Sequence, residues 1–293
     1  MNFTQKTLTT LLSLLFSVNA FSQKKEIYYG QKATLKAEVI LESGETKNGF
    51  IENFAIPRIG SNLQSVTSIE KRLNFTSKEI NFKTTATSVK EALKIEDIKR
   101  IIILDADDSE RLIYDKMKLK TINTQLEVVD LDKTVLLPLQ QEGKLSLYGF
   151  SVTMMSTNNL QGFGTAKHYD LTLFIPYIKN KNSDYAYIPF DINRMNFLNI
   201  GTLEGKFKIA VEEATKDCPE FSQFMKENYE KMDKIDKKEL KKQYFEKEDK
   251  KKEIRKTVKN KDMQNFLQAK VDSEYGMKPY IQIVDQYNST CTK

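Results

Sequence analysis

A change in the spacing of apolar residues near residue 199 divides this sequence into two kinds of structure. In the first part apolar residues alternate with polar ones, as at Leu35, Ala37, Val39 and Leu41. A period of two residues is typical of half-buried β-strands. After residue 199 apolar residues recur every three or four positions, which predicts amphipathic helices. We therefore expect an α+β fold, with a predominantly antiparallel β body followed by a helical C-terminal region.

Short strands and turn residues fill the first half of the β body. The segment "VILESGETKNGFI" predicts a hairpin whose turn is supplied by Gly44. "KEINFK" predicts a strand, and "LKIEDIKRIIIL" predicts two strands separated by a tight turn at Glu96 and Asp97. Several short strands of this kind predict a small barrel or strongly bent sheets. We assign residues 23–105 to a barrel-like subdomain and residues 106–199 to a second β-rich portion, in which Pro176 and Pro189 indicate edge strands.

The C-terminal region, residues 200–293, contains four helical patterns. The first precedes Asp217, which is placed to cap the second helix in "DCPEFSQF". Residues 226–261, here called the Lys/Glu-rich segment, predict a long solvated helix, a coiled coil or a helical hairpin. Gly276 is expected to end the last helix, because glycine is common just beyond helix C-termini.

The N-terminus has the organisation of a secretory signal peptide. Lys6 precedes the apolar run Leu11–Val18, and small residues follow at Ala20 and Ser22. The run is shorter than the about 20 residues that a bilayer requires. We expect residues 1–22 to be removed after Ser22, with cleavage after Ala20 as the alternative. The mature chain is then expected in the periplasm or outside the cell, without a transmembrane segment.

Two cysteines, Cys218 and Cys291, remain after removal of that peptide. An even number of cysteines in an exported protein favours a disulfide. Such a bridge would stabilise the fold by roughly 4 kcal/mol in the chain-entropy description. Two free thiols are the first alternative. A nucleophilic Cys218 is the second, since a helix N-terminus lowers a thiol pKa, but the sequence supplies no evident partner base.

The excess of positive charge in this chain is local. The formal net charge is +6, and the Lys/Glu-rich segment alone holds fifteen basic and nine acidic residues. Basic helices can bind polyanions or anionic lipid, whereas interspersed acids are typical of a self-supporting helix. The candidate contacts to a weakly bound anionic surface are Lys237, Lys238, Lys241, Lys242, Lys250, Lys251, Lys252 and Arg255. Export argues against nucleic acid as the partner.

Motifs that would indicate an enzyme or a cofactor are incomplete. His168 is the sole histidine, and a Ser-His-Asp triad would depend on it without the usual nucleophile motif. "DADDSE" at 105–110 starts like a calcium loop but lacks its later ligands. "GFGTAK" at 162–167 lacks the spacing of a phosphate-binding loop. We therefore expect no catalytic residue, no metal and no cofactor.

Several segments resemble one group of proteins. These are a leader ending in "FSQ", then "VILESGETKNGFI", "IEDIKRIII", "DCPEF" and a terminal "YNSTC". Together they resemble uncharacterised exported proteins of Bacteroidetes-type bacteria, a group with no assigned activity. The resemblance implies a location outside the cytoplasm and a β-rich body with C-terminal helices. The Lys/Glu-rich segment departs from that pattern.

The expected function is that of an exported, non-enzymatic binding or envelope-associated protein. Loops 57–72 and 156–167 are the expected recognition surface, since binding residues concentrate on loops held by a rigid scaffold. A secreted hydrolase that uses carboxylates is the first alternative. Attachment to an anionic surface through the Lys/Glu-rich segment is the second.

Overall fold

The structure is a computed structural model that describes residues 34–52, 54, 62–63, 78–104, 111–158, 167–188, 203–233 and 237–291. Two compact units are distinguished. The first comprises residues up to Ile56 together with Ser77–Tyr114, and the second comprises Pro57–Thr76 and Asp115–Lys293. The expected boundary at residue 105 stays a prediction, because residues 105–110 lie outside the described residues.

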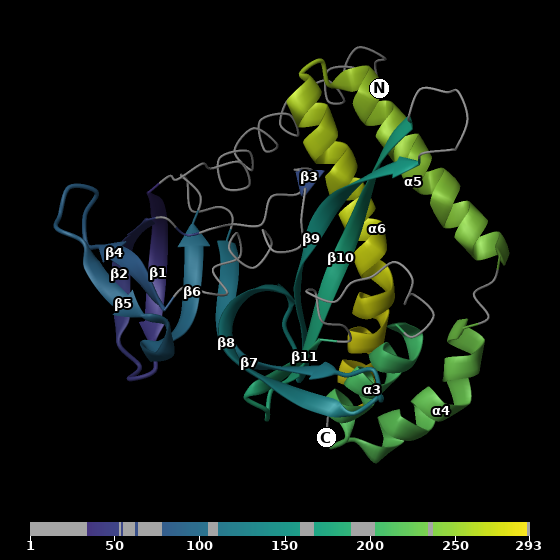
Figure 1. Cartoon of the computed structure of the whole chain (residues 1–293), viewed down its shortest axis with the longest axis horizontal. Coiled ribbons are helices and arrows are strands. Elements are labelled where there is room, and N and C mark those ends of the chain that lie inside the picture. Colours follow the sequence, from purple (N-terminus) through teal and green to yellow (C-terminus); the bar gives the residue numbers. More distant parts are fainter. Residues whose placement is uncertain are drawn as a thin grey trace, which may run out of the picture. The chain divides into compact units, whose positions relative to one another are not determined.

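The first unit is a five-stranded antiparallel sheet. Its elements are β1 (Leu35–Leu41), β2 (Thr46–Glu52), β4 (Glu79–Lys83), β5 (Glu91–Lys94), the 3₁₀ turn η1 (Ile95–Asp97) and β6 (Ile98–Leu104). The order is β6-β1-β2-β4-β5, so four strands form a meander and β6 returns to pair with β1 (Figure 1). The predicted hairpin is confirmed, with Gly44 at φ +88° in its turn. The predicted strand–turn–strand at Glu96 is also confirmed.

The second unit contains a closed five-stranded barrel. Its strands are β7 (Arg111–Ile122), β8 (Val128–Gln141), β9 (Leu145–Asn158), β10 (Lys167–Asn180) and β11 (Tyr185–Ile188). Neighbours pair in that order, and β11 then pairs in parallel with β7, which closes the ring. A short strand, β3 (Asn62–Leu63), adds to β9 in parallel.

Closure of the ring overturns one prediction. Pro176 lies in β10, which pairs with β9 along its length and with β11 near its end, so it does not mark an edge strand. Proline is tolerated there because the ladder between β10 and β11 begins at Ile178, two residues later. Pro189 lies outside the described residues.

Strands β9 and β10 of the barrel bury side chains on both of their faces. The inner face carries a cluster that includes Met117, Leu137, Phe150, Ile175 and Tyr177. The outer face carries a second cluster, in which Leu147, Phe174 and Ile178 pack against helix residues. Alternating side chains of β10 therefore enter two different cores, as expected of a strand covered on both sides.

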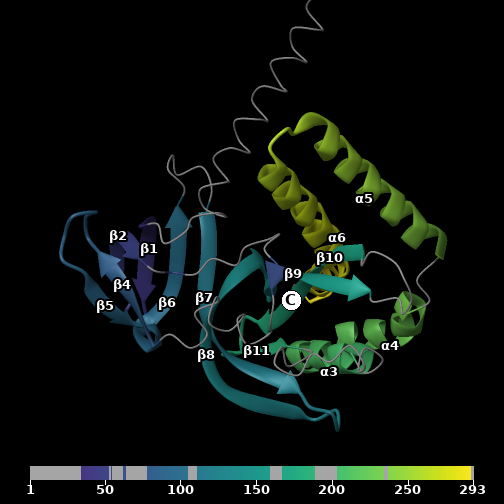
Figure 2. The ribbon, with the colours of Figure 1, turned by 45° about the horizontal axis from the view of Figure 1, so that its top comes forward.

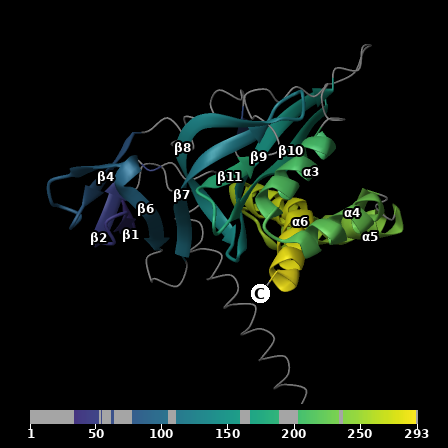
Figure 3. The same ribbon diagram turned by 90° about the horizontal axis from the view of Figure 1, so that it is seen from below.

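Four described helices follow the barrel: α3 (Leu203–Thr215), α4 (Pro219–Asp233), α5 (Lys237–Thr257) and α6 (Lys261–Thr290). Figure 3 shows that they gather on one side of the barrel strands. Helix α6 runs beside β9 and β10, and α3 contacts β10 and β11. The α+β class with C-terminal helices is thus confirmed.

Two helix boundaries differ from the sequence expectation. Helix α4 begins at Pro219, and its first turn is closed by the Ser222 amide donating to the Cys218 carbonyl, so Asp217 is not its cap. Helix α6 continues through Gly276 and Pro279 instead of ending at Gly276.

The Lys/Glu-rich segment does not form one helix over 226–261. Residues 258–260 separate α5 from α6, and the Asn260 side chain accepts a hydrogen bond from the Met263 amide as the cap of α6. The two helices lie side by side as a helical hairpin (Figure 2).

Candidate functional site: the cysteine pair and the surface of α5

The two cysteines meet at the junction of α3, α4 and the end of α6. Cys218 lies between α3 and α4, and Cys291 follows α6 directly. Their Sγ atoms lie at disulfide distance, 2.03 Å, and their Cα atoms are 6.0 Å apart although 73 residues separate them. Both side chains belong to the core between helices and barrel, and only 3% and 4% of their surface is exposed. A thiol reagent therefore has little access to this position.

A buried polar network lies in the same core. The Tyr287 hydroxyl donates to the Asp217 carboxylate over 2.7 Å, and the Asn180 amide donates to the same carboxylate oxygen over 2.9 Å. Asn180 also donates to the Ala214 carbonyl at the end of α3. Burial, together with the hydrogen bond to Asp217, raises the pKa of Tyr287 well above its usual value. This network joins β10, α3 and α6 through side chains.

The last turn of α6 is also tied to the turn between β8 and β9. The Asn288 side chain forms two hydrogen bonds with the backbone of Leu145, one to the amide and one to the carbonyl, at 2.9 and 3.0 Å. The Lys144 ammonium donates to the Cys291 carbonyl over 2.9 Å. The C-terminal end of α6 is thus held by the barrel as well as by the cysteine pair.

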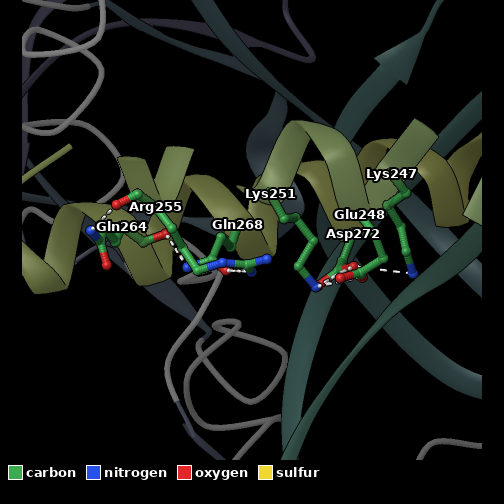
Figure 4. A network of polar contacts seen from close by, with 7 residues as sticks. All are labelled: Lys247, Glu248, Lys251, Arg255, Gln264, Gln268 and Asp272. Carbon is green, nitrogen blue, oxygen red and sulfur yellow. Dashed lines mark hydrogen bonds and ion pairs between the residues drawn. The ribbon is translucent and has the colours of Figure 1, made fainter. Parts of the chain in front are cut away.

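One face of α5 is engaged by α6. Lys251 forms an ion pair with Asp272 at 2.9 Å, and Lys247 approaches the same carboxylate at 3.3 Å (Figure 4). The Arg255 guanidinium donates to the Gln268 side chain over 2.6 Å. These contacts use long basic side chains to hold two helices together.

The eight basic residues predicted to contact an anionic surface differ in their surroundings: some contact α6, some are exposed, and two have side chains that are not described. Lys251 and Arg255 point toward α6, and the Lys250 ammonium lies 5.3 Å from the Tyr275 ring. Lys241, Lys242 and Lys252 are exposed. Lys237 and Lys238 lie in α5, but their side chains are outside the described residues. Lys250 and Arg255 are exposed as well, but both contact α6.

Sequence reasoning missed two exposed aromatic residues on α5. Tyr244 and Phe245 are 57% and 53% exposed, and their rings meet edge to face with centroids 5.8 Å apart. The ammonium groups of Lys247 and Lys241 each lie 5.9 Å from one of these rings. Their adjacency was the available signal, because adjacent residues point in different directions around a helix, so packing against α6 along one side cannot cover both rings.

The barrel interior contains a second group of polar side chains. The Tyr148 hydroxyl on β9 donates to the Asp115 carboxylate on β7 over 2.7 Å, and both side chains are buried. Burial lowers the pKa of Lys179 on β10, against the attraction of Asp115 and Asp184. A hydrogen-bonded carboxylate and phenol near a lysine whose pKa is lowered is a combination of side chains also found in active sites.

Other sequence candidates lie mostly outside the described residues. These are "DADDSE" at 105–110, most of "GFGTAK", and the greater part of both proposed recognition loops. The backbone of His168 belongs to β10, but its side chain is not described. Across the part of the chain that the structure describes, His, Cys, Asp and Glu side chains form no group able to hold a metal ion. Within the same residues, none of the helices combines the length and apolarity that crossing a bilayer requires.

Comparison with known proteins does not assign this site. No family model matches the chain, and neither a curated protein nor a solved structure matches it.

Proposed function

We propose that this chain is an exported, non-enzymatic binding or envelope-associated protein of the periplasm or cell exterior. The observation that carries the proposal is the pair Cys218 and Cys291, whose sulfur atoms lie at disulfide distance inside a buried core. Disulfides persist in oxidising compartments outside the cytoplasm. The signal-peptide organisation of residues 1–22 supports the same compartment independently.

The binding role rests on how the scaffold is built. The barrel is filled by apolar side chains, and its outer face is covered by helices whose last turn is fixed at Cys291. Strand β9 ends at Asn158 and β10 begins at Lys167, and the two strands pair along their length, so paired strands flank residues 159–166, which lie outside the described residues. Rigid elements that hold a loop are a common arrangement for recognition. We assign recognition to this loop, together with the segment around β3.

The test is retention of an envelope component by the immobilised protein. The native protein and a variant with residues 159–166 replaced by a Gly-Ser linker of equal length are compared. A second variant, with the exposed turn at 84–88 replaced in the same way, is the control. We expect the native protein and the control to retain the same component and the loop variant to lose it. Equal retention by all three, or by none, would contradict the assignment.

A secreted hydrolase is the second candidate, and the group formed by Asp115, Tyr148 and Lys179 is the observation that favours it. In such an enzyme Asp115 or Lys179 would transfer the proton during hydrolysis. Turnover of envelope glycans, lipids or peptides by the native protein, lost in Asp115→Asn, would establish it. A native protein that retains a partner without turnover favours the binding function.

A further inference from the structure

The side of α5 that faces away from α6 combines lysines with an exposed ring. Spacings of four, seven and four residues place four exposed side chains on one helix face. They are Lys241, Phe245, Lys252 and Lys256. Lys242 lies next to this row, and Asp249 interrupts it. All six side chains are exposed. We call these six residues the outer face of α5.

The opposite side of the helix explains why the outer face stays open. Lys251 and Arg255, together with Lys247, are held by Asp272 and Gln268 of α6. These contacts fix the rotation of α5 about its own axis. The outer face is thereby directed away from the partner helix, as Figure 4 shows for the labelled side chains on the inner face.

We infer that the outer face of α5 rests on an anionic phospholipid surface, with Phe245 and Tyr244 placed among the lipid headgroups. The outer face carries four lysines and one aspartate, and the exposed Glu246 and Glu253 border it, so a net positive charge remains that is complementary to a negatively charged surface. Aromatic rings are favoured at the boundary between water and acyl chains, and lysines beside them reach the phosphates. A soluble polyanion would neutralise the lysines but leave both rings in water. The lipid surface accounts for the rings as well as for the charge.

This inference deepens the proposed envelope association and depends on it only for the compartment. Exported protein that binds no vesicle would remove the inference alone. If residues 1–22 were not removed when the host makes the protein, export would be contradicted, whatever the affinity of the protein for lipid. The two failures are therefore distinguishable.

The experiment uses protein exported with its own leader and purified from the periplasm. It measures co-sedimentation with vesicles of phosphatidylglycerol and phosphatidylcholine in equal parts, and with pure phosphatidylcholine. We expect binding to the mixed vesicles at about 0.1 M salt and its loss near 1 M, because screening shortens the reach of the charges. Changing Lys241, Lys242, Lys252 and Lys256 to Gln is expected to weaken binding by about tenfold or more.

A matched control removes the same charge elsewhere. Lys78, Lys90, Lys94 and Lys99 are exposed lysines of the first unit, and their change to Gln should leave binding within about twofold of the unmodified protein. Tyr244→Ser with Phe245→Ser should weaken binding by about tenfold, whereas Val89→Ser, at a residue 92% exposed, should not. Equal losses in the test and control variants would overturn the inference.

Because the sequence contains no tryptophan, an introduced indole can report whether residue 245 enters the lipid headgroup region. Phe245→Trp introduces a single indole, whose emission should move to shorter wavelength on the mixed vesicles. Val89→Trp is the control and should show no change. An indole that responds to heparin, in a protein that binds no vesicle, would assign the face to a soluble polyanion and overturn the lipid proposal.

Discussion

Tyr287 makes the free energy of unfolding of the second unit depend on pH in the alkaline range. Its hydroxyl is buried and donates to Asp217, and both effects raise its pKa above the usual value of about 10. Because the folded-state pKa is the higher one, the contribution is fully present below pH 10 and is lost as pH rises further. Burial raises the pKa of Tyr280 and Tyr187 in the same direction. We expect the free energy of unfolding to fall steeply above about pH 10.

Tyr287→Phe tests this residue directly, with urea unfolding measured across pH 8 to about 11. The variant should lose about 1–3 kcal/mol at pH 8, because Asp217 and Asn180 lose a buried partner. Above pH 10 its decline should be shallower than that of the native protein. Tyr244→Phe, at an exposed ring, is the control. Parallel curves for Tyr287→Phe and the native protein would contradict the assignment.

Position 149 requires glycine, because of both its backbone conformation and the atoms that surround it. It lies in β9 at φ +145°, and an added Cβ would come within 2.2 Å of the Ile175 carbonyl oxygen. Gly149→Ala should therefore lower the free energy of unfolding by about 2 kcal/mol or more, measured by urea denaturation. Gly205→Ala in α3, where the nearest atom is 3.9 Å away, should not destabilise the protein.

At the residue scale, sequence reasoning could predict the cysteine pairing but not its surroundings. Two cysteines leave only one intramolecular pairing, so counting was sufficient. Asn180, Asp217 and Tyr287 come from three distant segments, and no local pattern indicates that they meet. Asp217 was assigned as a cap because its spacing fitted one, whereas tertiary contacts use its carboxylate elsewhere.

Helix α6 shows how an element can continue through residues that usually end helices. Gly276 and Pro279 both lie inside it. An added Cβ at Gly276 would lie 3.7 Å from the nearest atom of Phe174, an ordinary contact. Gly276→Ala should therefore raise the free energy of unfolding by about 0.5–1 kcal/mol, through the lower flexibility of the unfolded chain. A decrease in the urea midpoint would contradict the placement of Gly276 within the helix.

At the element scale, strands were predicted better than helix ends. Each hairpin of the first unit has local alternation and a turn residue such as Gly44, so its signal lies within a dozen residues. The end of α5 and the passage of α6 through Pro279 depend on packing against the barrel and on Asn260. Barrel closure by β11 and β7 is similarly non-local, which is why Pro176 was wrongly taken to mark an edge strand, although β10 pairs with both β9 and β11.

For the whole molecule, the cysteine pair is expected to stabilise the second unit. Removing a native disulfide from a small exported domain typically costs about 2–5 kcal/mol. Urea unfolding of the native protein with and without reductant should therefore give midpoints that differ by a corresponding amount. A variant with Cys218→Ala and Cys291→Ala should match the reduced protein and should not respond to reductant. A midpoint unaffected by either treatment would contradict the structural role.

The most direct test of the central claim is intact-mass analysis of the protein from its own host, alkylated without reductant. The account predicts a chain that begins at Gln23, carries no alkyl group and lacks the two thiol hydrogens. Peptide mapping should then find Cys218 joined to Cys291. A chain that retains residues 1–22 would contradict export, and a chain in which both thiols are alkylated would contradict the disulfide.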